Sequence, residues 1–102
     1  MALPIRWSLR AARHLESIAD NIGADSPHYA ALFTKRVMDT VRAIPENPAM
    51  GRMVPEYADP GLRERILRGY RIVYRVTSQT IEVVAICHGS RILQNVIEEP
   101  DK

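Results

Sequence analysis

The feature that most constrains this chain is a run of strand-like sequence in its second half. Residues 62–88 read LRERILRGYRIVYRVTSQTIEVVAICH, a stretch rich in β-branched and aromatic residues with short polar breaks. Such segments are typical of short strands that are joined by tight turns. We therefore expect three consecutive antiparallel strands, which need a second layer of structure to cover their apolar face.

A tight turn at Ser78-Gln79 would set the register of the last two of these strands. The opposed pairs are then Val76 with Ile81, Arg75 with Glu82, Tyr74 with Val83, and Val73 with Val84. One face of the sheet becomes apolar and packs on helices, through Ile72, Tyr74, Val76, Ile81, Val83, Ala85 and Cys87. The other face comprises Arg71, Val73, Arg75, Glu82, Val84, Ile86 and His88.

This second face has an apolar centre, formed by Val73, Val84 and Ile86, between charged edges. The outer face of a sheet normally alternates to polar residues, so an apolar centre indicates that something covers it. The cover could be the C-terminal segment 92–97, a second copy of the chain or a separate protein. The pattern alone does not choose among the three.

The first half of the chain begins with one short strand and one helix. Residues 2–7 have strand character. Proline cannot donate a ladder hydrogen bond, so this strand should lie at a sheet edge or have Pro4 at its start. Apolar residues then recur every three or four positions, which predicts an amphipathic helix. Ser8 is its expected N-cap and Gly23 its expected stop.

Ser26 and Pro27 open a second helix, whose apolar stripe runs from Ala30 to Ile44. A link of about three residues makes the two helices an antiparallel hairpin. The expected fold class is therefore α+β, in the order β-α-α-β-β-β, with the hairpin packed on a small, mainly antiparallel sheet. We expect a single domain over 1–97 and a frayed acidic tail over 98–102.

Charge and cysteine content indicate the cellular compartment of the protein more clearly than its activity. Twelve of the fourteen basic residues are arginine, but a net charge of +2 is too small to predict nucleic-acid binding by itself. The single cysteine, Cys87, falls in a predicted strand, which favours a buried thiol in a reducing compartment. No stretch approaches the ~20 apolar residues that span a bilayer and no signal peptide is visible, so we expect a cytoplasmic protein without a membrane partner.

The candidate working surface is cationic. It combines the arginines of the predicted sheet with the residues at its end: Arg63, Arg65, Arg68, Arg71, Arg75, His88 and Arg91. Guanidinium groups recognise phosphates and carboxylates, so this surface could bind a target, although Arg75 opposite Glu82 is most simply a cross-strand ion pair. With His88 as general acid or base, the same group could cleave RNA. The three histidines lack ligand spacing, so neither a metal nor a cofactor is expected.

Several strings along the chain resemble one known family when they are taken together. They are IRWSLRAARHLESIADNI, then NPAMGRMVPE followed by DPGLRERIL, then YRIVYRV, and finally IEVVAICHGSR. In this order and spacing they resemble the RelE/ParE superfamily of type II toxin–antitoxin toxins, and in particular its ParE branch. The resemblance covers about residues 3–93.

The resemblance implies a bacterial toxin that inhibits growth and is neutralised, in a hetero-oligomer, by a cognate antitoxin protein. The antitoxin would then cover Val73, Val84 and Ile86. ParE-type members inhibit DNA gyrase, and the seven cationic residues above would contact that target. RelE-type members are ribosome-dependent endoribonucleases that cut mRNA, and in that case the catalytic candidates are His88, Arg65, Arg71, Arg75 and Arg91.

The end of the chain favours the gyrase-directed branch over the nuclease. The predicted sheet contains no lysine, and the residues after Arg91 end in an acidic run instead of the basic, aromatic terminus expected of a RelE-type nuclease. A third hypothesis is a plain interaction domain that pairs with another chain and has no toxicity.

Overall fold

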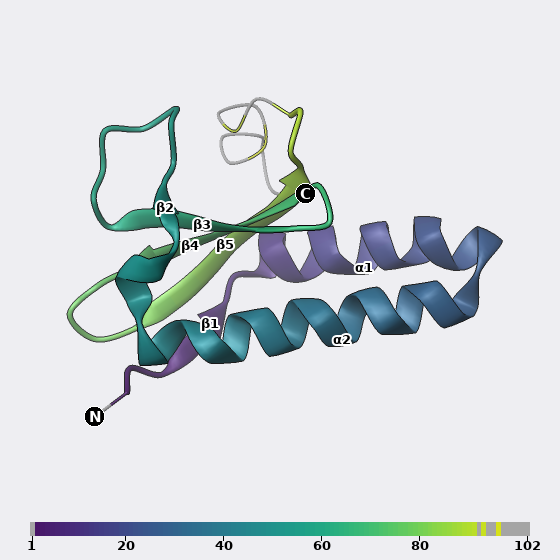
Figure 1. The fold of residues 1–102 in the computed structure, drawn as a ribbon, viewed down its shortest axis with the longest axis horizontal. Coiled ribbons are helices and arrows are strands. Elements are labelled where there is room, and N and C mark those ends of the chain that lie inside the picture. The colour runs from purple at the N-terminus through teal and green to yellow at the C-terminus, as the bar shows by residue number, and fades with distance from the viewer. Residues whose placement is uncertain (1, 92, 94–95, 97–102) are drawn as a thin grey trace.

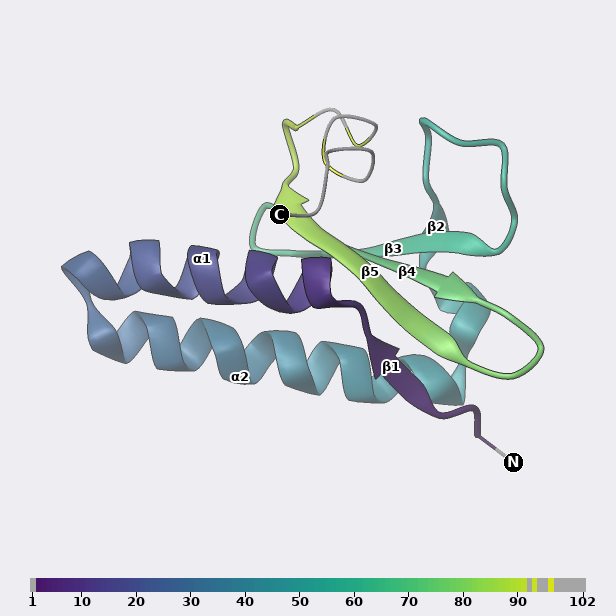
Figure 2. The same cartoon turned by 180° about the vertical axis from the view of Figure 1, so that it is seen from behind.

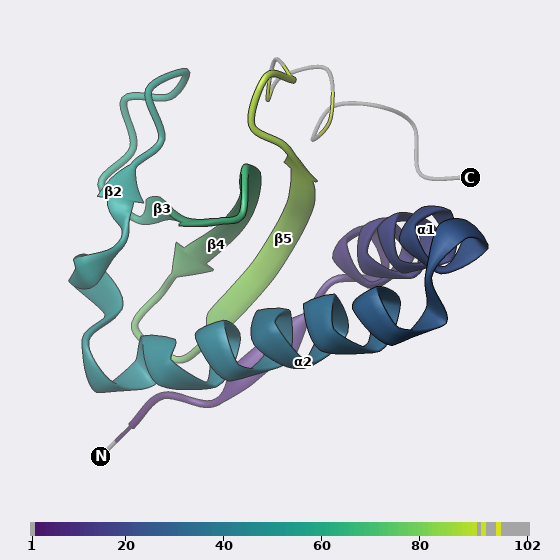
Figure 3. The same cartoon turned by 45° about the vertical axis from the view of Figure 1, so that its right-hand side comes forward.

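The computed structural model describes residues 2–91, 93 and 96. Its elements, in chain order, are β1 (Ile5–Trp7), α1 (Leu9–Asp25), α2 (Pro27–Ala43), the 3-10 turns η1 (Ile44–Glu46) and η2 (Pro48–Met50), β2 (Arg52–Met53), β3 (Leu62–Leu67), β4 (Tyr70–Val76) and β5 (Ile81–His88). The two helices cover one face of a five-stranded sheet, and the loop between β2 and β3 rises on the other side (Figure 1, Figure 3). The predicted α+β class is confirmed, whereas the predicted tail over 98–102 lies outside the described residues.

The helix hairpin turns at a single residue. Ser26 has extended backbone angles, φ −153° and ψ 101°, and its hydroxyl accepts a hydrogen bond from the backbone N–H of Tyr29 at 3.2 Å. The predicted stop at Gly23 and the predicted three-residue link are therefore wrong, because α1 continues through Asp25. The reason is Pro27, since the residue before a proline is disfavoured in the helical region.

In the part of the chain that the structure describes, no helix combines the length and the apolar character needed to cross a membrane.

The sheet has the strand order β1-β5-β4-β3-β2. β1 lies at one edge, as predicted, and runs parallel to β5, whereas the other neighbours are antiparallel. Figure 2 shows β1 beside β5. The backbone N–H of Ile81 donates to the carbonyl of Pro4 at 2.9 Å. At the opposite edge lies the short strand β2, which the sequence did not predict. Both edge strands are short, which limits the unpaired backbone that they present to other chains.

The hairpin of β4 and β5 follows the predicted register only near its turn. The first three predicted pairs are confirmed: Val76 with Ile81, Arg75 with Glu82, and Tyr74 with Val83. The next predicted pair is wrong, because Val73 pairs with Ala85 and not with Val84. Val84 is thus an extra residue in β5, which is the definition of a β-bulge.

The bulge reverses the orientation of every side chain that follows it in β5. Because side chains alternate between faces, one extra residue moves all later positions to the opposite face. Ile86 packs with the helices, and the ring of His88 contacts the ring of Tyr70, whose ring also contacts Phe33 of α2. Cys87 packs instead on the side of the loop. The prediction that Ala85 and Cys87 face the helices is therefore wrong, as is the prediction that Ile86 and His88 lie on the opposite face.

The helix hairpin and the sheet share one core, which we call the helix-side cluster. It consists of the buried residues Ala11, Phe33, Val37, Val41, Ile72, Val83 and Ile86. Phe33, Val37 and Val41 recur at a spacing of four, so they form one stripe along α2 that faces the sheet. This packing confirms the predicted apolar face of the second helix.

The opposite face of the sheet carries a second core, which we call the loop-side cluster. Its buried members are Val54, Leu62, Val73, Ala85, Cys87, Leu93 and Val96. Val54 comes from the loop after β2, whereas Leu93 and Val96 come from the C-terminal segment. Of the apolar centre predicted to need a cover, Val73 is completely buried beneath other residues of the chain itself.

The start of the long loop is held against the sheet by Tyr74. This side chain is completely buried, its hydroxyl donates to the carbonyl of Pro48 at 2.7 Å, and the same hydroxyl accepts from the backbone N–H of Gly51 at 3.1 Å. A Cβ atom at position 51 would collide with that hydroxyl, so the close approach requires glycine. The predicted core position of Tyr74 is confirmed.

Candidate functional site

The middle of the predicted cationic surface is occupied by a buried ion-pair network around Arg71. The Arg71 side chain is 5% exposed. Its two terminal nitrogens, Nη1 and Nη2, donate to the two carboxylate oxygens of Glu56, each at 2.7 Å. Its Nε donates to Oε1 of Glu64 at 2.6 Å. Arg71 was predicted to bind a target, but its guanidinium is already bound to two carboxylates.

The network joins three parts of the chain. Glu64 of β3 has a fully buried side chain, and its second carboxylate oxygen accepts a hydrogen bond from Nε of Arg52 in β2. Glu56 lies in the loop between β2 and β3 and also accepts from the backbone N–H of Leu93 at 3.0 Å. Arg71 donates in addition to the carbonyl of Arg91 at 3.3 Å. The sheet, the loop and the C-terminal residues are therefore held together by charge-assisted hydrogen bonds.

The network lowers the pKa of its carboxylate Glu56 and raises the pKa of Arg71. Hydrogen bonds from Arg71, together with the backbone N–H of Leu93, lower the pKa of Glu56 from its ordinary value of 4.5 to about 2 despite partial burial. The hydrogen bonds to Glu56 and Glu64 raise the pKa of Arg71. Each charged form thus stabilises the other, which is the expected behaviour of a close ion pair.

Acid is expected to weaken the fold through Glu56. A carboxyl whose pKa is lower in the folded chain contributes its full stability above the unfolded value, here 4.5, and loses it as the pH falls toward about 2. The urea midpoint of the native chain should therefore decrease between these pH values. Glu56→Gln cannot ionise and should show a shallower decrease, whereas Glu46→Gln, at an exposed site in η1, should keep the native slope. Equal slopes for all three proteins would contradict the assignment.

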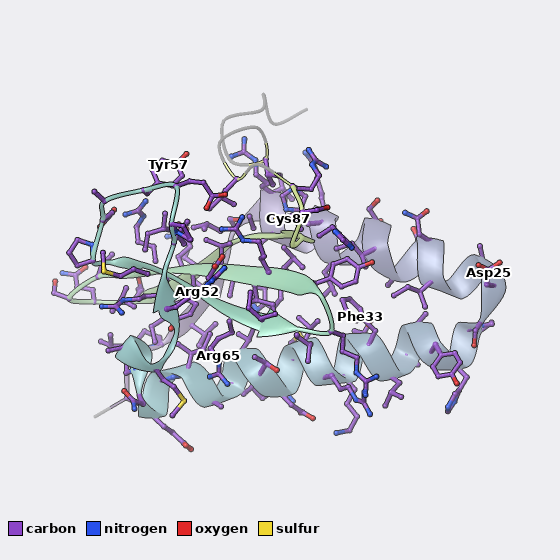
Figure 4. The ribbon with its side chains drawn as sticks, turned by 45° about the horizontal axis from the view of Figure 1, so that its top comes forward. Asp25, Phe33, Arg52, Tyr57, Arg65 and Cys87 are labelled. Atoms are coloured by element: carbon purple, nitrogen blue, oxygen red, sulfur yellow. The ribbon has the colours of Figure 1, made fainter. Side chains whose placement is uncertain are left out.

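The remaining arginines of the predicted surface lie on both faces of the sheet. In β3, Arg63 and Arg65 pair with Tyr74 and Ile72, so they point to the side of the helices (Figure 4 labels Arg65). Arg63 donates through Nε to the carbonyl of Pro60 at 2.9 Å. Partners in a ladder share a face, so β3 presents cations beside the helix hairpin.

Arg68 and Arg75 are exposed, as are His88 and Arg91 at the end of the predicted surface. Arg68 occupies the turn between β3 and β4 with a positive φ of 51°, next to Gly69. Arg75 donates to Oδ2 of Asp59 at 2.7 Å, and this hydrogen bond lowers the pKa of Asp59. The predicted cross-strand ion pair with Glu82 is thus replaced by a pair with the loop, although Glu82 does lie opposite Arg75 in the ladder.

His88 lies at the exposed end of β5. Its ring contacts the Tyr70 ring edge-on, with 5.6 Å between centroids. Its Nδ1 atom lies 2.8 Å from the hydroxyl of Ser90 and accepts from the backbone N–H of Ser90 at 3.3 Å. These contacts fix the ring at the end of the strand, next to the residues that lead to Arg91.

The five residues predicted for a nuclease are not brought to one place. Arg65 and His88 point to the side of the helices, whereas Arg71 and Arg75 lie on the side of the loop. The bulge in β5 moved His88 away from the face shared by those two arginines. Only Arg91 is connected to Arg71, and that connection runs through the Arg91 backbone carbonyl.

Besides Glu56 and Glu64, the structure adds another polar residue that the sequence did not single out. His14 of α1 accepts, through Nδ1, the backbone N–H of Ile86 at 3.2 Å. β1 ends at Trp7, opposite Val83, so β1 does not pair with the backbone of β5 beyond this point, which is bonded to β4 on its other side. His14 supplies an acceptor for one backbone N–H of β5 that β1 does not reach. No local pattern indicates it, because the contact joins positions 72 residues apart.

The predicted burial of the Cys87 thiol is confirmed. Cys87 is buried, and this burial raises the pKa of its thiol. A raised pKa disfavours the reactive thiolate. Within the described residues, no group of three or more histidines, cysteines and acidic side chains could hold a metal ion.

The three residues predicted to contact an antitoxin do not form one exposed patch. Val73 is buried in the loop-side cluster and Ile86 in the helix-side cluster, on opposite faces of the sheet. Val84 is half-buried against the loop-side cluster. A role in antitoxin contact stays a prediction for all three, and Val84 is the one that retains exposed surface.

Comparison with known proteins identifies the family. A sequence family described as "ParE toxin of type II toxin-antitoxin system, parDE" matches residues 5–93. A protein of Sinorhizobium fredii (strain NBRC 101917 / NGR234), named "Putative toxin Y4kP", is 38% identical over 91 residues, which cover 83% of this chain and 86% of that protein.

Solved structures of related folds agree with this match. The chromosomal ParDE toxin–antitoxin system of P. aeruginosa superimposes with a TM-score of 0.70 and 21% identity, over 85% of this chain and 96% of that one. A double-arginine mutant of the E. coli toxin RelE in the free state gives 0.68 and 16%, over 97% and 94%. The RelBE2 toxin–antitoxin complex of Mycobacterium tuberculosis gives 0.61 and 17%, over 86% and 99%. These similarities concern the fold, whereas the sequence match covers most of the chain, and the chain therefore belongs to the ParE family of type II toxin–antitoxin toxins.

Proposed function

We propose that this toxin arrests growth by binding DNA gyrase, without catalysing a chemical step of its own. The observation that carries the proposal is the neutralisation of Arg71 by Glu56 and Glu64. RNA cleavage needs an acid or base and a charge-stabilising cation at the same phosphate. In this chain the candidates are split between two faces of the sheet, and the central cation is bound to carboxylates. That arrangement favours a binding surface over a RelE-type nuclease that cuts mRNA on the ribosome.

The proposed contact surface centres on β3 and the turn that follows it. Arg63, Arg65 and Arg68 follow one another along β3 and its turn, on or beside the face of the helices. The planar fork of arginine suits carboxylates and other oxyanions at a protein interface. Arg75, His88 and Arg91 would extend this surface at its margins, and Arg71 is left out because it is buried.

We also propose that a cognate antitoxin protein neutralises the toxin in a hetero-oligomer. The support is the family match, whose description names the parDE toxin–antitoxin pair, together with similar folds that were solved as toxin–antitoxin systems. The cytoplasm is the proposed location, because gyrase and its DNA substrate are there.

Pulse labelling after induction of the toxin without antitoxin separates the two targets. We expect thymidine incorporation to stop within the first minutes while methionine incorporation continues. The purified toxin should then inhibit gyrase supercoiling of plasmid DNA in vitro. If methionine incorporation stops first and mRNA is cut on ribosomes, the nuclease replaces the present proposal. If neither changes, the chain is an interaction domain without toxicity.

Point variants test the surface itself. Arg65→Ala with Arg68→Ala should weaken gyrase inhibition at least ten-fold, because hydrogen bonds to charged groups contribute about 1.5–3 kcal/mol each. Arg42→Ala, at an exposed arginine on α2, is the matched control and should inhibit as well as the native chain. His88→Ala should have little effect, whereas loss of a general acid or base would slow a nuclease by roughly 10²–10⁴-fold.

A further inference from the structure

The helix hairpin extends past the end of the sheet, as Figure 1 and Figure 2 show. Between the hairpin and the turn that joins β3 to β4 lies a pocket of about 430 Å³. Its lining includes three aromatic rings, from Tyr29, Phe33 and Tyr70, and two guanidinium groups, from Arg36 and Arg68. The pocket therefore combines an aromatic wall with positive charge.

The aromatic wall has an inner part and an outer part. Tyr29 and Phe33 are one turn apart on α2, so they share a face of that helix. The Phe33 ring belongs to the helix-side cluster and meets the ring of Tyr70 edge-on, with 5.1 Å between centroids. Tyr29 is 63% exposed and forms the outer part. A planar ring in the pocket would contact aromatic side chains, which stabilises such a pair beyond the burial of apolar area alone.

The two guanidinium groups reach the pocket from different elements. Arg36 lies about one turn beyond Phe33 on α2, and Arg68 lies in the turn between β3 and β4. Arg68 is exposed and Arg36 is half-buried. Both side chains line the pocket, so an anion placed between the helix and the turn would be within reach of two permanent positive charges.

The backbone of Arg68 indicates that the turn itself does not require an arginine. Arg68 has a φ of 51° and the next residue, Gly69, has a φ of 82°. Glycine, asparagine and aspartate are favoured in this left-handed region, whereas other side chains adopt it at some cost in energy. A residue in such a conformation is a reason to look for a function in its side chain, and the side chain of Arg68 lines the pocket.

The two parts of the lining select a ligand that also has two parts. A carboxylate matches the planar fork of a guanidinium group through two parallel hydrogen bonds. A planar ring matches the aromatic wall, and Ile22 and Leu32 add apolar contact. The volume equals that of about fourteen water molecules at ~30 Å³ each and falls in the range of small-molecule sites. It is sufficient for one aromatic ring with a short acidic chain.

We propose that this pocket binds a small aromatic carboxylic acid, with the ring against Tyr29 and Tyr70 and the carboxylate on Arg36 and Arg68. The inference does not depend on gyrase as the target, since it rests on the pocket. Arg68 also belongs to the proposed contact surface, so an acid bound here would occupy one margin of that surface.

Tyrosine NMR, with phenylpropanoate as the probe, tests the location of binding. The chain has four tyrosines, so single Tyr→Phe substitutions assign every ring signal of the labelled protein. We expect the ring signals of Tyr29 and Tyr70 to shift saturably. Tyr57, which packs against the loop-side cluster, and Tyr74, which is buried beside Pro48, are the internal controls and should not shift.

Two analogues separate the contributions of the charge and the ring. Phenylpropanamide keeps the ring but has no charge, and it should bind at least about ten-fold more weakly because the charged hydrogen bonds are lost. Cyclohexylpropanoate keeps the charge but has a saturated ring, and it should bind about two-fold to ten-fold more weakly. Tyr29→Leu removes an exposed aromatic ring and keeps an apolar side chain, so it should reduce the preference for the phenyl ring.

Arg68→Asn provides the matched variant for the cationic side. Asparagine suits the positive φ of the turn, so the fold should stay intact while one guanidinium group is lost. The affinity for phenylpropanoate should decrease by about ten-fold. Arg42→Asn makes the same change at an exposed position of α2 outside the pocket and should bind like the native chain.

Three results would overturn the proposal. The first is the absence of saturable shifts at Tyr29 and Tyr70, or equal shifts at all four tyrosines. The second is equal affinity for phenylpropanoate and either of its analogues, because the lining would then not select an aromatic acid. The third is equal affinity of Arg68→Asn and Arg42→Asn for phenylpropanoate, since the acid would then be bound elsewhere.

Discussion

Replacing Arg71 by methionine is expected to destabilise the fold by about 3–5 kcal/mol, the usual cost of removing one partner from a buried ion pair. The substitution keeps most of the side-chain volume but leaves Glu56 and Glu64 without the cation that both contact. Glu64 is the more costly of the two, because its side chain is fully buried. Urea unfolding at pH 7, followed by circular dichroism, measures the loss.

Two comparisons show whether the loss comes from the unpaired carboxylates. Arg75→Met removes an ion pair with Asp59 that is exposed and screened by solvent, and should cost far less than Arg71→Met. Adding Glu64→Gln to Arg71→Met should recover part of the stability, since one buried charge is removed. Similar losses for Arg71→Met and Arg75→Met, or no recovery in the double variant, would show that the network contributes little beyond its packing.

Phe33→Ala is expected to cost about 3–5 kcal/mol, because it removes a large side chain from the helix-side cluster and leaves a cavity. Phe33 is 7% exposed, and its ring meets the Tyr70 ring edge-on with 5.1 Å between centroids. Chemical unfolding with a constant m-value would report this loss as a lower midpoint.

Tyr29→Ala is the control for the Phe33 prediction. Tyr29 lies one turn earlier on α2 and is 63% exposed, so its loss should change stability by only about 0.5 kcal/mol. Ile18→Ala should fall between the two, since Ile18 is only partly buried against the cluster. A Phe33→Ala cost below about 1 kcal/mol would mean that α2 presents another stripe to the sheet.

Local sequence was sufficient for the two helices, for β1, β3, β4 and β5, and for the fold class. The apolar stripe of α2, the caps at Ser8 and Ser26, and the turn at Ser78-Gln79 all depend on interactions between residues a few positions apart. Such interactions can be predicted from spacing alone. Where two local signals competed, at Gly23 and Pro27, proline ended the first helix because it excludes the helical region sterically for the residue before it.

The candidate site could be predicted only as a set of residues, not as an arrangement. A single bulged residue, Val84, moved Ile86 and His88 to the face of the helices, and no strand pattern marks such an insertion. The partners of Arg71 come from a loop 15 residues away and from the neighbouring strand, so its burial was not visible from the sequence. The contact between His14 and Ile86 is more distant still.

The sequence by itself determined the two helices and the main strands, which family the chain resembles, and that arginine dominates its cations. Only the tertiary structure decided which arginines remain on the surface and which distant groups His14 and His88 contact. The physical reason is that helix and strand formation respond to periods of a few residues, whereas charge pairing depends on which distant groups the folded chain brings within hydrogen-bond distance. The same twelve arginines could serve several surfaces, and the carboxylates of Glu56 and Glu64 exclude Arg71 from all of them.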